Sequence, residues 1–259
     1  MDVERLFSVR DKVVVVTGGS RGIGEMIARG FVAAGSRVYI SSRSVEACEE
    51  LAAELSAVGT CVALPADLSD PAEVRRLAGE VVEREDRVDV LVNNAGAAWG
   101  APLDEYPESG WDKVMDLNVK SLFLLTQALA PQLRAAASAD DPARVINIGS
   151  IDGGFHVPAF ETYAYSASKA AVHQLTRHLA KFLAADHVTV NAIAPGFFPS
   201  KMTAFMLEHE EQLIAAIPMG RVGTPEDMAG IAIYLASRAG AYTTGAVIPV
   251  DGGHATLAS

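Results

Sequence analysis

Cysteine is scarce in this sequence, and so are long apolar runs. Two cysteines, Cys48 and Cys61, occur in 259 residues, and neither belongs to a C-x-x-C pair or a His/Cys cluster with zinc spacing. We therefore expect buried, inert thiols in a reducing compartment and no metal site. No apolar stretch approaches the length of a membrane span, and residues 1–12 lack the apolar core of a signal peptide. These absences predict a cytoplasmic protein without a membrane anchor.

Positive charge is also under-represented. Lys and Arg total 21 against 32 Asp and Glu, which gives a formal net charge of −11. Such a surface repels nucleic acid phosphates and anionic lipid, so neither is expected as a partner. A phosphorylated cofactor is still compatible with this charge, because a few local arginines outweigh distant charge that salt screens.

Hydrophobic residues are plentiful, at 50% of the chain, and their pattern predicts the fold. Short runs rich in Val and Ile alternate with longer amphipathic segments, and the runs are nearly all apolar, as in parallel strands covered on both faces. No linker or repeat interrupts them, so we expect a single α/β domain over residues 1–259, a doubly wound parallel seven-stranded sheet flanked by helices. Strands are predicted at 12–17, 37–41, 61–64, 88–92, 144–148, 187–192 and 246–250, and helices at 24–34, 45–58, 71–84, 110–137, 165–185 and 225–236.

A glycine-rich turn follows the first predicted strand. It runs Thr17-Gly-Gly-Ser-Arg-Gly-Ile-Gly24 and leads into a predicted helix. Glycines let the turn close tightly and let the backbone approach a ligand, while the helix N-terminus offers N–H groups to a pyrophosphate. A glycine turn alone is a weak signal, but this position favours dinucleotide binding. The lysine of a P-loop is missing, which argues against a nucleotide triphosphatase.

Further motifs stand in order along the chain, and together they resemble one family. They are Asn93-Asn-Ala-Gly96, Asn118 in LNV, Ser150 in INIGS, Tyr165-Ser-Ala-Ser-Lys169 and Pro195-Gly196. With the glycine turn, this set is similar to the short-chain dehydrogenase/reductase family over nearly the whole chain. The residues around the motifs also resemble the β-ketoacyl reductases of that family, particularly the branch associated with rhamnolipids. The resemblance implies a Rossmann fold and a nicotinamide cofactor.

The resemblance also implies residue roles. Asp67 and Leu68 are expected to line an adenine pocket, and residues 93–96 to support the cofactor near its middle. Asn93 and Asn94 have an alternative, which is to tie neighbouring strands together through side-chain hydrogen bonds. The predicted catalytic residues are Asn118, Ser150, Tyr165 and Lys169, and the predicted cofactor contacts are Gly18, Ser20, Arg21, Gly22, Ile23, Gly24, Ser42, Arg43, Asp67, Leu68, Asn94, Ala95, Gly96, Tyr165, Lys169, Pro195, Gly196, Phe198 and Ser200.

The end of the second predicted strand indicates the cofactor. A carboxylate there would hydrogen-bond an NAD ribose and repel a 2′-phosphate. Here Ser42 stands where NAD-specific members of the family usually carry Asp, Arg43 follows it, and Arg21 lies in the glycine turn. Two guanidinium groups suit a dianionic phosphate, so we expect NADP(H), although Arg43 as a solvated strand-end residue is the alternative.

Tyr165 and Lys169 are four residues apart and share one face of a predicted helix. A free phenol has a pKa of about 10, and we expect the ammonium group and the positive ring of an oxidised nicotinamide to lower it. In the reduction of a ketone, Tyr165 would protonate the oxygen while Ser150 hydrogen-bonds to it. As in the family, Lys169 would also hold the nicotinamide ribose, and Asn118 would keep a water in the proton relay.

Other candidate groups are assigned structural roles. Ser150 has no G-x-S-x-G context, so a hydrolase elbow is not indicated. His173 and His178 lie five apart on a predicted helix and point in different directions. We expect His156 at a loop surface and Tyr163 packed in the loop before the helix.

The substrate side is predicted to be apolar. The resemblance implies a substrate lid at about residues 197–220, and Ser200 stands where the family commonly carries Thr. Either Ser200 or Thr203 could therefore contact the nicotinamide. Lys201 could meet an anionic carrier or simply be solvated. Aromatic residues at Trp99, Phe155, Phe160, Phe197 and Phe198 favour an acyl or lipophilic ketone, or else they pack on one another or on a partner subunit.

We therefore expect an NADPH-dependent oxidoreductase that reduces a ketone to a secondary alcohol, with a 3-oxoacyl thioester as the favoured small-molecule substrate. A polyol, sugar-acid or steroid dehydrogenase is the alternative within the family, and a catalytically silent NADP-sensing module is the alternative outside enzymes. The resemblance further implies a homotetramer, or a homodimer, formed through the helices at 110–137 and 165–185.

Overall fold

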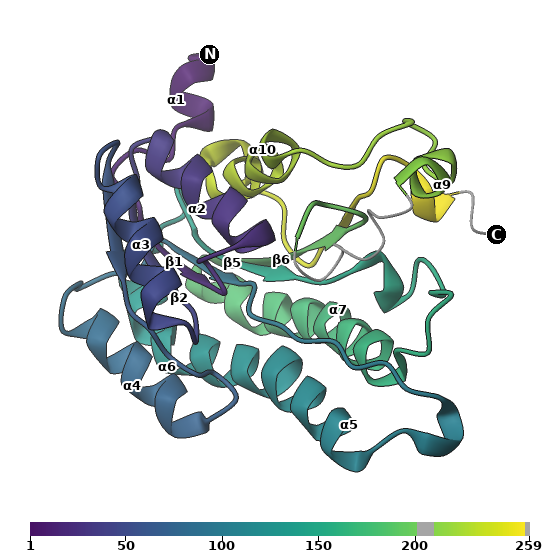
Figure 1. Cartoon of the computed structure of the whole chain (residues 1–259). Coiled ribbons are helices and arrows are strands. Elements are labelled where there is room, and N and C mark those ends of the chain that lie inside the picture. The colour runs from purple at the N-terminus through teal and green to yellow at the C-terminus, as the bar shows by residue number, and fades with distance from the viewer. Residues whose placement is uncertain (201–209, 257–259) are drawn as a thin grey trace.

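Seven parallel strands form the centre of the molecule (Figure 1). In this computed structural model, which describes residues 1–200 and 210–256, their order across the sheet is β3-β2-β1-β4-β5-β6-β7. The strand order therefore reverses between β1 and β4, the position at which doubly wound sheets bind ligands. The strands are β1 Val13–Thr17, β2 Arg37–Ser41, β3 Thr60–Ala63, β4 Val90–Asn93, β5 Ala143–Ile148, β6 Val188–Pro195 and β7 Val247–Val250.

Helices cover both faces of the sheet, which explains why its central strands are apolar throughout. Val14 and Val16 of β1 pack with α2, α3 and α10, whereas Val13 and Val15 pack with α4, α6 and α7. Every residue of β1, β4, β5 and β6 is consequently buried. Among the described helices, none is long and apolar enough to cross a membrane. Their bounds are α2 Gly22–Ala33, α3 Val45–Leu55, α4 Pro71–Val82, α6 Ser121–Ala136, α7 Tyr163–Leu183 and α10 Pro225–Ala236.

The segment predicted as one helix over 110–137 is built differently. Helix α5 (Glu108–Met115) continues into a π-helical turn, Asp116–Lys120, before α6 begins. Such a widened turn is not visible in an apolar periodicity, and π turns frequently occur at functional sites. Here it contains the buried Asn118.

Several shorter elements complete the description. Tyr163 begins α7 instead of lying in the preceding loop, so that prediction is wrong; its hydroxyl donates to Glu161 at 2.9 Å. A short α1 (Val3–Phe7), a 3₁₀ turn η3 (Ile151–Gly153), α9 (Glu210–Ala215) and a 3₁₀ turn η6 (His254–Thr256) were not expected from the sequence pattern.

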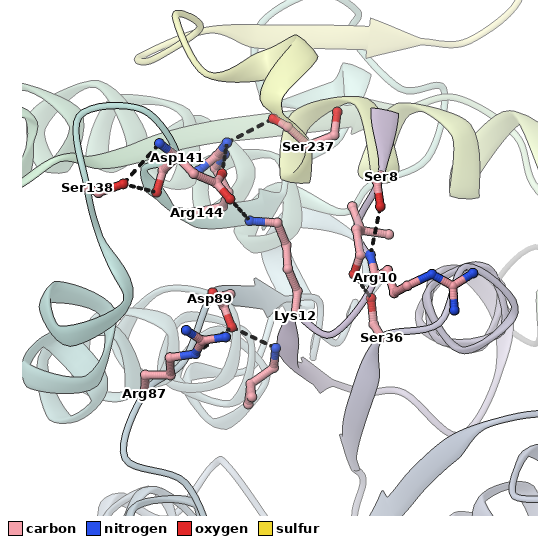
Figure 2. Close-up of polar contacts among 12 residues, drawn as sticks. Ser8, Arg10, Lys12, Ser36, Arg87, Asp89, Ser138, Asp141, Arg144 and Ser237 are labelled. Atoms are coloured by element: carbon pink, nitrogen blue, oxygen red, sulfur yellow. Dashed lines mark hydrogen bonds and ion pairs between the residues drawn. The ribbon is translucent and has the colours of Figure 1, made fainter. Parts of the chain in front are cut away.

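A polar network joins segments at the amino ends of β1 and β5 (Figure 2). Asp141 accepts hydrogen bonds from Lys12 at 2.7 Å and from Arg144 at 3.0 Å. Arg144 is 1% exposed, and its guanidinium also donates to the backbone carbonyls of Leu235 at 3.1 Å and Ser237 at 2.8 Å. This buried cation therefore ties the start of β5 to the end of α10.

Replacing Arg144 with Met is expected to lower the free energy of unfolding by about 2 kcal/mol, because two buried carbonyls lose a charged donor. Chemical denaturation of both proteins measures the difference. Arg134→Met is the matched control, since Arg134 pairs with Asp186 with its side chain 50% exposed. Its cost should stay below about 1 kcal/mol. Equal losses in the two variants would contradict a special role for Arg144.

Candidate active site

Loops at the carboxyl ends of the strands enclose a cleft of about 480 Å³. It lies at the reversal between β1 and β4, as expected for a doubly wound sheet. Of the predicted site residues, Gly24, Asp67 and Asn118 do not line it. Those that do are Gly18, Ser20, Arg21, Gly22, Ile23, Ser42, Arg43, Leu68, Asn94, Ala95, Gly96, Ser150, Tyr165, Lys169, Pro195, Gly196, Phe198 and Ser200.

The glycine turn has this shape because two of its residues adopt left-handed backbone angles, with φ of 63° at Gly18 and 55° at Gly22. Gly24 packs against the turn instead of the cleft. A Cβ atom there would lie 2.2 Å from the Gly18 carbonyl oxygen and 2.4 Å from Nδ2 of Asn94. Helix α2 begins at Gly22, and its N-cap residue Arg21 makes no side-chain cap. The N-terminus of α2 can therefore face an anion in the cleft.

Thr17 and Asn94 lock this turn to the loop after β4. The Thr17 hydroxyl accepts hydrogen bonds from the backbone N–H groups of Asn94 at 2.9 Å and Ala95 at 3.0 Å. The Asn94 amide donates to the carbonyls of Thr17 at 2.9 Å and Gly18 at 3.0 Å. No role was predicted for the Thr17 side chain, because a hydroxyl at a strand end carries no distinctive pattern.

Asn93 instead follows the strand-tying alternative. Its amide donates to Oδ1 of Asn147 on β5 at 2.9 Å and to the Thr126 hydroxyl on α6 at 3.1 Å. The two adjacent asparagines therefore have different tasks: Asn93 joins the core elements, and Asn94 shapes the wall of the cleft.

The cleft is basic although the chain as a whole is acidic. Among the described residues that line it, none is acidic, whereas Arg21, Arg43, Lys113 and Lys169 are basic. Just after β2, the Ser42 hydroxyl donates to the Ser44 carbonyl at 3.1 Å, and Arg43 is exposed and forms no ion pair with the described residues. A pocket with this charge suits an anionic ligand that the surrounding acidic surface would repel.

Ser150, Tyr165 and Lys169 are brought together on one side of the cleft. Ser150 follows β5 and lines the cleft together with Tyr165, whose phenolate form its hydroxyl favours. Lys169 lies one turn further along α7, with Nζ 5.5 Å from the Tyr165 ring centre. This ammonium group donates to the Ile148 carbonyl at 2.8 Å, a contact that the sequence did not indicate.

Burial shifts the pKa values of Tyr165 and Lys169 in opposite directions. Burial raises the pKa of Tyr165 to about 12, although the hydrogen bond with Ser150 acts in the opposite direction. Burial likewise lowers the pKa of Lys169 to about 8. Desolvation of the phenolate therefore gives a net rise in this structure, and the lowering expected from the ammonium group and a bound oxidised nicotinamide stays a prediction. At pH 7 the phenol keeps its proton.

Asn118 lies behind the cleft wall and braces it. Its side chain accepts from the Ala97 N–H at 2.8 Å and donates to the Ala97 carbonyl and the Ser168 hydroxyl, both at 2.9 Å. Ser168 directly precedes Lys169, so the π turn of Asn118 connects the loop after β4 to α7. The water relay predicted for Asn118 remains a prediction.

Asp67 also turns away from the cleft. Its carboxylate accepts from the backbone N–H of Ser69 at 3.1 Å and the Ser69 hydroxyl at 2.8 Å, while Ala66 and Leu68 line the cleft. Lys113 and Leu117 are lining residues that sequence reasoning missed. Their signal was available, because both precede Asn118 on the same predicted helix.

The predicted apolar pocket is only partly visible. Phe198 is 2% exposed and lines the cleft beside Ser200. Trp99 instead packs on Gly110 and lies under the Lys113 ammonium group, 5.1 Å from the ring centre. The packing alternative therefore describes Trp99.

Two more predicted aromatic residues lie outside the cleft lining. Phe155 contacts the His173 ring at 5.7 Å, and Phe160 is 48% exposed. Ser200 lies beside the glycine turn, since a Cβ on Gly22 would be 3.1 Å from it. Lys201 and Thr203, with the rest of the predicted lid over 201–209, lie outside the described residues.

Comparison with known proteins agrees with this geometry. The enoyl-(acyl carrier protein) reductase family model matches residues 18–255. The chain is 56% identical over 250 residues to the rhamnolipids biosynthesis 3-oxoacyl-[acyl-carrier-protein] reductase of Pseudomonas aeruginosa, covering 95% of this chain and 97% of that one. It is 37% identical to a galactitol 2-dehydrogenase (L-tagatose-forming) of Cereibacter sphaeroides, covering 98% and 99%. The solved Pseudomonas aeruginosa RhlG/NADP active-site complex superposes with a TM-score of 0.93 at 55% identity, covering 97% and 99%.

Proposed function

Since the chain belongs to the short-chain dehydrogenase/reductase family of oxidoreductases, we propose that it reduces a 3-oxoacyl thioester to the 3-hydroxy compound with NADPH. The observation that carries this proposal is the meeting of Ser150, Tyr165 and Lys169 at one side of a basic cleft. The substrate class is supported by the 56% identity of the chain to the rhamnolipids biosynthesis 3-oxoacyl-[acyl-carrier-protein] reductase of Pseudomonas aeruginosa.

The residues present fit a phosphorylated dinucleotide. The glycine turn brings bare backbone to the cleft, and Gly24 leaves no room for a side chain behind it. Arg21 and Arg43 would hold the 2′-phosphate, the N-terminus of α2 the pyrophosphate, and Lys169 the nicotinamide ribose. The contacts would be completed by Leu68, residues 94–96, Pro195, Gly196, Phe198 and Ser200. When bound, NADPH supplies the hydride.

The chain's own residues handle the proton. Tyr165 keeps its proton at neutral pH, because its pKa is about 12, and would donate it to the carbonyl oxygen. Ser150 would hydrogen-bond the same oxygen and hold it near the phenol. As the proton leaves, the ammonium group of Lys169 stabilises the phenolate, an interaction that is stronger after transfer than before it. Asn118 would act by holding the loop after β4 and, as in the family, by keeping a water in the relay.

The proposal is tested by NADPH oxidation at 340 nm with acetoacetyl thioester, together with a panel of keto-sugars, keto-sugar acids and steroids. We expect kcat/KM to be highest for the thioester. If kcat/KM were highest for a keto-sugar or keto-sugar acid, the polyol or sugar-acid dehydrogenase alternative would replace the proposed function. Binding of NADPH without turnover of any ketone would favour the silent sensing module, although the chain retains both Tyr165 and Lys169.

Family membership also supports a single catalytic domain over residues 1–259 with a substrate lid at about 197–220. Two buried free cysteines support a cytoplasmic location. Large apolar side chains that are exposed to solvent on the two long helices support a homotetramer, with a homodimer as the alternative. Phe123 on α6 is 41% exposed and Phe182 on α7 is 66% exposed. Light scattering in solution measures the molar mass, and the mass of a monomer would exclude both the tetramer and the dimer.

A further inference from the structure

One basic residue of the cleft has no task in the proposed reaction. Of the basic residues in the described lining, Arg21 and Arg43 are assigned to the cofactor phosphate. The Lys169 ammonium group is directed to the Ile148 carbonyl, to which it donates at 2.8 Å. Lys113 on α5 remains, and it is exposed. Within the part of the chain that the structure describes, no carboxylate pairs with its ammonium group, so this group can meet an anion from outside.

The Trp99 ring gives this ammonium group a defined position. Nζ of Lys113 is 5.1 Å from the ring centre, within the range of a cation–π contact. Trp99 is itself held in place, because its carbonyl accepts from the Tyr106 hydroxyl at 3.1 Å and a Cβ on Gly110 would be 2.8 Å from its ring. Lys113 lines the cleft, whereas Trp99 does not. The ammonium group therefore lies at the edge of the cleft, where a long ligand would leave it.

This edge lies on the same side of the cleft as the start of α7. Trp99 belongs to the loop after β4, and that loop runs past the segment before α7, where the Ala101 N–H donates to the Glu161 carbonyl at 3.3 Å. The first turn of α7 then contains Tyr165. Helix α5 also contacts α7 and lies beside it (Figure 1). A molecule that presents its ketone to Tyr165 therefore has Lys113 on one of its ways out.

The cationic groups assigned to the cofactor phosphate come from other segments. Arg43 directly follows β2, and Arg21 precedes α2 in the turn after β1. In the sheet, β2 and β4 flank β1 on opposite sides. Lys113, which contacts the loop after β4, is therefore available to a second molecule when the cofactor is bound. Because the chain has a net charge of −11, an anionic substrate needs such a local cation at the place where it binds.

We propose that Lys113, held over Trp99, binds the phosphate of the phosphopantetheine arm of a 3-oxoacyl thioester. The ketone lies inside the cleft with Ser150 and Tyr165, and the arm leaves past α5. This role deepens the proposed reductase function and rests on it. It makes Lys113 a specificity-determining residue, because the contact favours thioesters with a charged arm over neutral ketones and touches none of the reacting atoms.

Two substrates that differ by one phosphate test this subsite. Acetoacetyl phosphopantetheine and acetoacetyl pantetheine present the same ketone and the same thioester. For the wild type we expect equal kcat and a KM about tenfold lower for the phosphorylated substrate, because it gains one charge-assisted contact. In Lys113→Met the two KM values should become equal, since the side chain keeps its bulk and loses its charge. Lys113→Arg keeps the charge and should retain the preference.

Lys120→Met is the matched control. Lys120 follows on the same helical segment, pairs with Asp116 at 3.1 Å and does not line the cleft, so its loss should leave the phosphate preference unchanged. The dissociation constant of NADPH should also be the same in Lys113→Met as in the wild type. Equal KM values for the two substrates in the wild type would overturn the proposal. So would a Lys113→Met protein that binds NADPH more weakly and retains the substrate preference.

Further substrates identify what delivers the anion. Acetoacetyl coenzyme A and acetoacetyl-[acyl carrier protein] both contain the pantetheine arm, and the one whose KM rises more in Lys113→Met is the carrier that this subsite serves. A keto-sugar acid has a carboxylate and no such arm. If Lys113→Met raised the KM of the keto-sugar acid and of neither thioester, the assignment to the arm would be wrong.

A second measurement needs no turnover. The chain has two tryptophans, so Trp111→Phe leaves Trp99 as the single emitter beside Lys113. With NADP⁺ present, phosphopantetheine should change this emission at a concentration about tenfold lower than pantetheine, and salt should reduce the difference. Adding Lys113→Met should abolish it. A phosphate preference in a protein that reduces no ketone would refute only the proposed function, whereas reduction of thioesters without that preference would refute only the subsite.

Discussion

Tyr165→Phe is expected to lower kcat for ketone reduction by about a thousandfold, the middle of the range for removing a general acid. The substitution deletes one hydroxyl from the cleft wall and leaves the ring in place. Ser150 and Lys169 remain, but neither takes over the proton donation, since Lys169 directs its ammonium group to the Ile148 carbonyl. Steady-state rates with NADPH and acetoacetyl thioester measure the loss, and tryptophan quenching measures NADPH binding, which should stay within a few-fold of wild type.

Tyr163→Phe is the matched control, because it removes a hydroxyl from the same helix only two residues away. The Tyr163 side chain is 39% exposed and bonded to Glu161, outside the cleft lining. We expect its kcat to equal that of the wild type. If Tyr165→Phe retained comparable activity, the proton donor would have to be another group and the proposed mechanism would fail.

Arg43→Ala is expected to weaken NADPH binding by about 100-fold while changing NADH binding by only a few-fold. The physical reason is that a guanidinium group gives charge-assisted hydrogen bonds to a phosphate dianion, which NADH lacks. Arg43 is exposed and lines a cleft whose described lining has no acidic side chain. The expected loss of affinity therefore comes from the attraction between the guanidinium group and the phosphate. Titration of each cofactor against both proteins gives the dissociation constants.

Two further variants make this test selective. Arg75→Ala removes an exposed arginine of α4 that lies outside the cleft, and we expect it to leave both cofactors unaffected. Ser42→Asp introduces the carboxylate that NAD-type sites carry, and it should shift the preference toward NADH. Equal losses for NADPH and NADH in Arg43→Ala would contradict the assignment of Arg43 to the 2′-phosphate.

Most of the fold could be predicted because the chain repeats one β-α unit, an apolar run followed by an amphipathic segment, and each part has a local pattern. Val13 to Val16 of β1 are apolar at every position, as expected of a strand covered on both faces. The helix predicted at 110–137 shows the limit of that reasoning. Its π turn depends on the hydrogen bonds of Asn118 with Ala97 and Ser168, residues from two other segments. A periodicity within one segment contains no information about such partners.

The candidate site shows the same division. The cleft gathers nearly every residue that the motifs indicated, because the loops after parallel strands meet at one edge of a sheet. The proton affinity of Tyr165 could not be predicted from its spacing to Lys169. It depends on how many atoms surround the phenol, on Ser150, and on a carboxylate at Asp152.

By itself, the sequence determined the order of strands and helices, the glycine turn and the identity of the groups that can move a proton, since these follow from local pattern and side-chain chemistry. Tertiary structure alone decided that Ile148 takes a hydrogen bond from Lys169 and that Asn118 and Asp67 lie outside the cleft lining. The reason is that desolvation and charge act through space, over distances set by segments far apart in the chain.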